Sequence, residues 1–217
     1  MKIERITRRG FLANSCPFAL LGAYPAFAET RSNFVEVRLP RGVTLMLPAH
    51  WRIIGPNEEQ MIQTSSEAAR DLSGITLPTG TESVLIAANS MPLSTYAAVR
   101  VISTTPSPIA PAQLSAMTPS VLRDVGVSMR DMTVRILSAQ GLALIEFLDT
   151  TIERISGYPA LVTTYRRSGP QGAVFVQSSV IYTGSQQLNV NLSYRESEVG
   201  LWKPVIEKIR RSIVVKQ

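Results

Sequence analysis

The feature that most constrains the fold is a succession of alternating segments between residues 145 and 195. Short turns rich in glycine, proline and serine separate these segments. From Leu188 to Tyr194 the even-numbered positions are apolar and the odd-numbered ones polar, as in a strand buried on one face. Turns this short join antiparallel neighbours. The sequence therefore predicts an antiparallel meander with strands at 145–156, 160–167, 173–183 and 186–195, a corner at 157–159, and hairpin turns at 168–172 and 184–185.

An amphipathic helix is predicted after the meander. Apolar residues recur at steps of three and four from Val199 to Ile213, which places them on one side of a helix. Pro204 interrupts the pattern, because its ring clashes with the carbonyl four residues earlier. We therefore expect the helix proper to begin at Pro204, after a looser turn that carries Trp202. This helix should lie across the sheet with Trp202 as its anchor.

The N-terminal half predicts more strands and a first helix. Strand patterns cover 35–39 and 43–47, and two longer apolar segments cover 83–90 and 94–104. Between these pairs a helix opens at Asn57 with a capping box and stops at Gly74.

A second helix follows a proline-rich loop at 105–111. Thr118 is its expected cap, with Pro119 at the first helical position. Gly126 predicts a bend or break, because glycine costs about 1 kcal/mol there relative to alanine. The buried stripe is expected at Leu122, Val125, Met129, Met132 and Ile136.

Residues 1–28 have the pattern of an export signal peptide. Thr7–Ala13 contains paired arginines followed by Phe and Leu, which resembles the motif read by the bacterial twin-arginine translocase. An uncharged apolar segment follows, and Ala26-Phe27-Ala28 has the small-x-small pattern of a signal peptidase site. We expect export by the twin-arginine route, with the translocase as a transient partner, cleavage after Ala28 and a periplasmic mature protein. The motif residues are Arg8, Arg9, Phe11 and Leu12.

This segment also explains two features of the composition. It carries a charge of +3, half of the net +6 of the chain, so the mature part is too weakly basic to indicate nucleic-acid binding. It also contains the only cysteine, Cys16, whose position does not fit a lipid-anchor motif. The remaining 189 residues, 29–217, are enough for one α+β domain with a sizeable core and show no membrane-span pattern.

The sequence lacks the residues that most classes of enzyme need. His50 is the only histidine and has no acid or nucleophile near it in sequence, so a structural role is favoured over a catalytic one. Motifs for phosphate, dinucleotide or serine-hydrolase sites are absent, and we expect no cofactor and no metal. Glu146, Asp149 and Glu153 could form a carboxylate pair. On a regular strand Glu146 would lie on the face opposite the other two, and a solvated strand face is the favoured interpretation.

Basic residues concentrate in the C-terminal third. If the meander brings them beside the last helix, they could form a patch for an acidic partner or anionic lipid. The favoured alternative is an ordinary solvated surface in which Glu207 and Arg211 pair four positions apart. The residues of this candidate patch are Arg166, Arg167, Arg195, Lys203, Lys208, Arg210 and Arg211.

Three local patterns carry a family resemblance. They are Leu47-Pro48-x-x-Trp51, Gly157-Tyr158-Pro159-Ala160, and Ser193-Tyr194-Arg195 ahead of Trp202-Lys203-Pro204. In this order they resemble the fold shared by the PsbP subunit of photosystem II, the bacterial DcrB proteins and a Ran-binding nucleotide-release factor. The resemblance implies a central antiparallel sheet flanked by helices on both faces and a mostly non-enzymatic, partner-binding role. It transfers no binding residue.

The sequence therefore favours an exported, non-enzymatic protein that binds another protein as an assembly, chaperone or stress factor. One alternative is a carrier that holds a small apolar ligand between the sheet and the helix bearing Met129 and Met132. A less favoured alternative is a hydrolase that uses Asp149 and Glu153.

Overall fold

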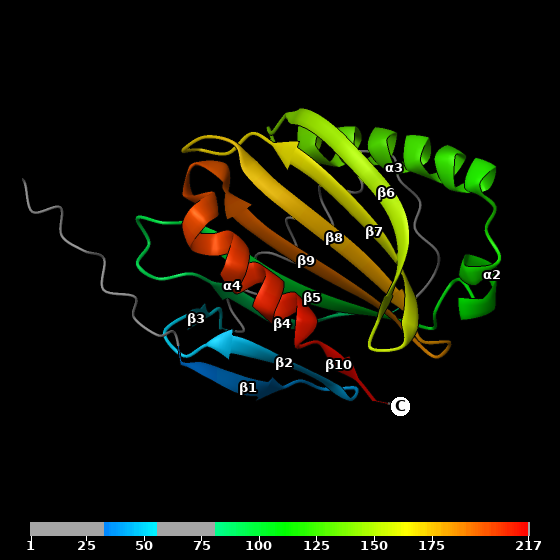
Figure 1. Cartoon of the computed structure of the whole chain (residues 1–217), viewed down its shortest axis with the longest axis horizontal. Coiled ribbons are helices and arrows are strands. Elements are labelled where there is room, and N and C mark those ends of the chain that lie inside the picture. Colours follow the sequence, from blue (N-terminus) through cyan, green and yellow to red (C-terminus); the bar gives the residue numbers. More distant parts are fainter. Residues whose placement is uncertain (1–32, 56–80, 217) are drawn as a thin grey trace, which may run out of the picture. The chain divides into compact units, whose positions relative to one another are not determined.

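A computed structural model describes residues 33–55 and 81–216, which form two antiparallel sheets and three α-helices within the unit Ser32–Gln217 (Figure 1). The smaller sheet has the order β1-β2-β10, and the larger one has the order β3-β4-β5-β9-β8-β7-β6. This confirms the predicted α+β class. The strands are β1 (Phe34–Arg38), β2 (Val43–Pro48), β3 (Arg52–Ile53), β4 (Thr81–Asn89), β5 (Ala97–Thr105), β6 (Leu144–Ile155), β7 (Tyr158–Arg167), β8 (Val174–Tyr182), β9 (Gln187–Arg195) and β10 (Val214–Val215).

The predicted meander is confirmed as β6 to β9, in which each strand pairs with the next in antiparallel register. The expected corner is a tight turn at Ser156-Gly157, where both residues have positive φ, 53° and 84°. Two positive angles in succession match the right-handed twist of a hairpin. The strand β5 extends the meander by pairing with β9, and β4 pairs with β5.

The C-terminal helix begins earlier than expected. The helix α4 spans Val199–Arg211, after a short 3-10 turn η1 (Glu196–Glu198), and contains Pro204 in its interior. The proline removes one hydrogen bond and costs about 3 kcal/mol. Trp202 and Ile206, on either side of it, are both only 4% exposed. Burying each apolar side chain contributes roughly 1.5–3 kcal/mol, so packing outweighs the proline and the helix forms through it.

The larger core lies where α4 packs on β9 and β2. Trp202 meets Trp51 edge to face, with 5.8 Å between the ring centroids. Leu45, Leu192 and Ile209 are nearly or fully inaccessible in the same cluster. The side chains of α4 therefore connect the smaller sheet to the larger one.

A smaller core lies under α2 (Pro111–Ser115) and α3 (Pro119–Ala139). Its sheet residues Leu161 and Val180 alternate along their strands with Ala160 and Ile181, which belong to the larger core. Leu114 is its most buried member, at 1% exposure.

The predicted start of α3 is confirmed, because Thr118 Oγ1 accepts a hydrogen bond from the backbone N–H of Val121 at 3.4 Å. The helix does not break at Gly126. This residue has no side chain, and its backbone lies close to Thr150 of β6. The expected stripe faces the sheet: Leu122, Val125 and Met129 pack against the smaller core, although all five stripe residues are only partly buried. The most buried side chains of the helix are Thr133 and Leu137, one position after Met132 and Ile136 of the stripe.

Two predicted segments lie outside the described residues: the signal peptide at 1–28 and the helix that was expected from Asn57 to Gly74. In the described part, every helix is too short or too polar to cross a bilayer.

Candidate functional site

The strand β6 forms one edge of the larger sheet, and two β-bulges interrupt it. Leu144 and Glu146 pair with neighbouring residues of β7, so Ile145 between them is an extra residue. Leu148 is extra in the same way between Phe147 and Asp149. A bulge redirects side chains and strengthens local twist. Both extra residues are exposed aliphatic side chains, Ile145 at 54% and Leu148 at 40%.

The helix α3 lies along β6 and adds exposed valines to this edge. Val127 and Val134 are 61% and 38% exposed. They are seven positions apart, so they face nearly the same direction on the helix. We call the surface formed by Val127, Val134, Ile145 and Leu148 the apolar edge.

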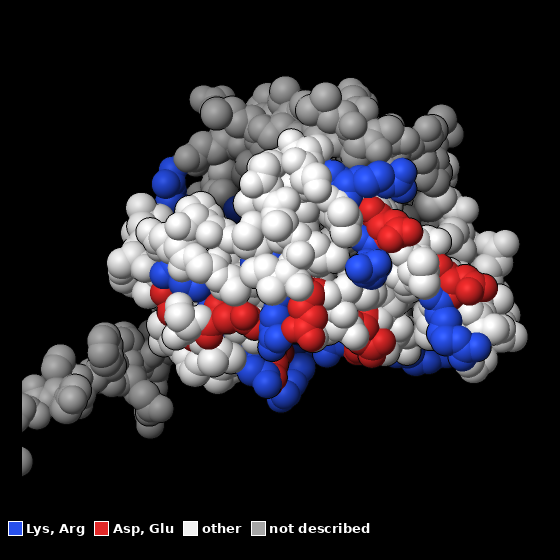
Figure 2. Space-filling model, turned by 90° about the horizontal axis from the view of Figure 1, so that it is seen from above, with Lys and Arg blue, Asp and Glu red and all other residues white. Residues whose placement is uncertain are grey.

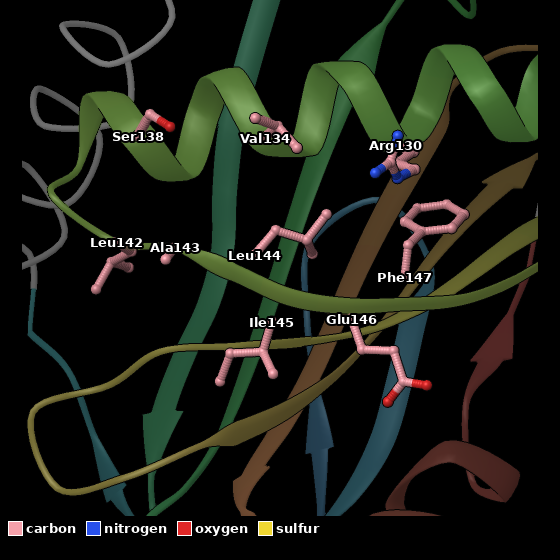
Figure 3. A pocket seen from close by; sticks show the side chains of 9 residues that line it. All are labelled: Arg130, Val134, Ser138, Leu142, Ala143, Leu144, Ile145, Glu146 and Phe147. Atoms are coloured by element: carbon pink, nitrogen blue, oxygen red, sulfur yellow. The ribbon is translucent and has the colours of Figure 1, made fainter.

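A pocket opens between the second half of α3 and the start of β6 (Figure 3). Its volume is about 540 Å³. Figure 3 shows Val134 and Arg130 directed from the helix toward the strand, and Leu144 and Phe147 directed back toward the helix. Polar and apolar atoms contribute about equally to its walls, and Arg130 and Glu146 both line it. Such a pocket can receive a partner side chain that combines an apolar part with a polar group.

Charges beside the apolar edge are paired within the chain. Arg166 of β7 contacts both Glu146 and Glu196. These two carboxylates raise the pKa of Arg166, first through its hydrogen bond to Glu146 and then through the charge of Glu196.

Most of the other residues of the candidate basic patch also have local partners. Arg195 pairs with Glu198, Arg210 with Glu153, and Arg211 with Glu207 at 3.3 Å as expected from their spacing. Figure 2 shows positive and negative side chains next to one another in several places, rather than a field of one sign. Because these charges are paired, the net positive potential of this region is small. Of the remaining three, Arg167 donates to the Ser168 carbonyl and the Tyr96 hydroxyl, Lys208 lies 3.9 Å above the Phe34 ring, and Lys203 is exposed on α4.

The three candidate carboxylates share one face of β6, which corrects the expected arrangement. Glu146 pairs with Arg166, Asp149 with Thr164 and Glu153 with Ala160, and these partners alternate regularly along β7. The bulge at Leu148 shifts the alternation by one residue, so Glu146 joins the other two. Glu146 and Glu153 are bound to arginines, and Asp149 accepts from the backbone of Thr150 at 2.7 Å.

Other candidate residues are separated from these. His50 is exposed in the turn after β2. Met129 packs against the smaller core, and neither it nor Met132 lines the pocket at α3. Within the described ranges, histidines and carboxylates form no group of three suited to a metal ion.

Sequence reasoning missed the apolar edge. Its signal is visible as two apolar pairs, Leu144-Ile145 and Phe147-Leu148, which break strict alternation twice in one strand. Alternation alone cannot distinguish a bulge from a strand buried on both faces.

Comparison with known proteins shows similarity at the level of the fold. No family model and no curated protein matches the sequence. Cyanobacterial PsbP (CyanoP) from Synechocystis, a solution structure, is 13% identical over 85% of this chain and 94% of its own, with a TM-score of 0.52. The described domain therefore has a PsbP-like α+β fold.

Two further structures align less closely. LpqN, involved in cell envelope biogenesis of Mycobacterium tuberculosis, is 14% identical over 85% of this chain and 91% of its own, with a TM-score of 0.48. PA94 from Pseudomonas aeruginosa, a protein of unknown function described as a putative regulator, is 10% identical over 85% of this chain and 99% of its own, with a TM-score of 0.40.

Proposed function

We propose that this chain is an exported, non-enzymatic protein of the bacterial envelope that binds another protein through the apolar edge. In this proposal the twin-arginine motif directs it to the periplasm, cleavage follows Ala28, and the mature domain acts as an assembly, chaperone or stress factor. The PsbP-like fold supports the proposal, because a resemblance to PsbP and DcrB proteins implies partner binding rather than catalysis. The proposed architecture is the full sandwich of that family, with helices on both faces of the central sheet.

The observation that carries the binding proposal is the pair of bulges in β6. Each bulge places an exposed aliphatic residue on β6, the last strand of the larger sheet among the described residues, and α3 alongside it carries two exposed valines. Isolated exposed apolar residues are common, but four of them on two adjacent elements, two of which line a pocket, are typical of a binding surface. The bulges also interrupt the regular spacing of free backbone groups along β6, which disfavours addition of a further strand. The partner is therefore held by side chains.

Introducing negative charge at the apolar edge tests this proposal. The double variant V134E/I145E places two carboxylates where the partner should bury apolar surface, and we expect it to lose at least about tenfold in affinity. The measurement is affinity capture of the partner from periplasm at native expression, followed by titration of the purified partner. Both positions are exposed, so the variant should fold with an unchanged circular dichroism spectrum.

The matched control is L93E, which makes the same type of change at a residue that is 64% exposed in the β4–β5 connection. It should retain the partner at full yield. Equal recovery by the wild type and V134E/I145E, or no reproducible partner for the wild type, would contradict the proposal.

A further inference from the structure

The turn between β1 and β2 holds an arginine in a strained backbone conformation. Arg41 has a φ of 61° and Gly42 a φ of 72°, the pair of positive angles that a two-residue hairpin turn requires. Asparagine, aspartate or glycine usually takes the first of these positions, because other residues are strained there. Strained residues of this kind gather at binding sites, where the strain serves to place a side chain.

The side chain of Arg41 reaches across to the larger sheet. Its guanidinium donates to the hydroxyl oxygens of Ser103 at 3.2 Å and Ser83 at 3.4 Å, and also to that of Thr105. All three acceptors are neutral. Glu82 pairs with Thr104 across β4 and β5, so it belongs to the opposite face of these strands. In the described part of the chain, no carboxylate contacts the Arg41 charge, whereas nearby Arg38 is paired with Glu36.

A pocket of about 440 Å³ lies at this turn, and the charged residues that line it in the described part of the chain are the cations Arg41 and Lys216. The hydroxyls of Thr105, Thr183 and Ser185 also line it. Thr105 accepts from the guanidinium and still has its own hydrogen to donate. Among the described residues that line the pocket, two are cationic, three carry hydroxyl groups and none is acidic.

The two cations are held at one pocket by the backbone. The N–H of Lys216 donates to the carbonyl of Gly42 at 2.8 Å, and a side chain at Gly42 would lie 2.2 Å from the Lys216 carbonyl oxygen. Gln186 fixes the turn from the other side: its amide donates to the Arg41 carbonyl at 3.2 Å and accepts from Ser103 at 2.9 Å. Figure 1 shows the β1–β2 turn beside β10.

From this arrangement we infer that the pocket at the β1–β2 turn binds a small oxyanion, either a phosphate group or a carboxylate. A guanidinium offers paired donors that match two oxygens of such a group, and Lys216 adds a second charge. The hydroxyl of Thr105 donates to a remaining oxygen, whereas that of Thr183 already donates to the Gln186 carbonyl at 3.0 Å. This site lies on a different part of the fold from the apolar edge and does not depend on the protein-binding proposal.

The test is the thermal stability of the full chain in inorganic phosphate, acetate or chloride at matched ionic strength. A ligand that binds only the folded state raises the melting temperature in a concentration-dependent way. We expect phosphate or acetate to raise it beyond chloride. A stronger effect of phosphate identifies a phosphoryl ligand, and a stronger effect of acetate a carboxylate. Equal melting temperatures in all three salts would overturn the inference.

Two substitutions separate binding from structure. R41N removes the charge and places a turn-favouring residue at the positive φ, so in chloride its melting temperature should equal or exceed that of the wild type. Its affinity for the preferred anion should fall about tenfold. R38N, in the same hairpin, should respond to the anion like the wild type. A wild-type anion response in R41N would overturn the inference, as would equal losses in R41N and R38N.

Discussion

Replacing Trp202 with alanine is expected to lower the free energy of unfolding by about 3–5 kcal/mol. Trp202 is 4% exposed, packs edge to face on Trp51, and donates its indole N–H to Glu198 at 3.1 Å. Removing the ring leaves a cavity between α4 and the sheets. Because small domains are stable by only about 5–15 kcal/mol, the variant should unfold at a much lower urea concentration than the wild type.

The neighbouring substitution L201A is the matched control for this measurement. Leu201 lies in the same turn of α4 but is 54% exposed, so its truncation should change stability by less than about 0.5 kcal/mol. Equal destabilisation by the two substitutions would show that α4 is held by its helical conformation rather than by the packing of Trp202.

The change from Glu198 to glutamine is expected to cost about 2–4 kcal/mol. Glu198 accepts from the backbone N–H of Tyr96 at 2.8 Å and from the indole of Trp202, and it pairs with Arg195. The two charged side chains are only 17% and 14% exposed. The amide has one acceptor oxygen in place of two, so it leaves Arg195 without its counter-charge in a poorly solvated position.

An identical change at Glu207 provides the comparison for E198Q. The Glu207–Arg211 pair is 46% and 77% exposed, with 3.3 Å between its charged atoms, and exposed helical pairs contribute less than about 0.5 kcal/mol. Chemical denaturation of E198Q and E207Q should therefore give clearly different midpoints. Coincident midpoints would mean that the contacts of Glu198 add nothing to stability.

Much of the fold could be predicted because strands, turns and caps are local properties. Alternation located the strands of the meander, and the Thr118-Pro119 pattern located the start of α3. The start of α4 could not be predicted from propensity. The penalty of Pro204 is local, but the compensating burial of Trp202 against Trp51 depends on residues about 150 positions apart in the sequence.

The candidate site was harder to predict because it depends on register and on contacts distant in sequence. The bulges at Ile145 and Leu148 are defined by what β7 pairs with, which β6 alone does not specify. The basic residues were visible as a group, but the partners of Arg210 of α4 and Arg166 of β7 include Glu153 and Glu146 of β6. Pairing between different elements converts an apparent patch of one sign into neighbouring opposite charges.

We propose that the apolar edge, rather than the basic side of α4, contacts the partner. A photo-crosslinking amino acid placed at Leu148 distinguishes the two surfaces, with Lys203 on α4 as the comparison position. Both side chains are exposed, so either can carry the probe without entering the core. Irradiation in the periplasm should yield one reproducible protein adduct from position 148 and none from position 203. An adduct from position 203 with none from position 148 would contradict the account.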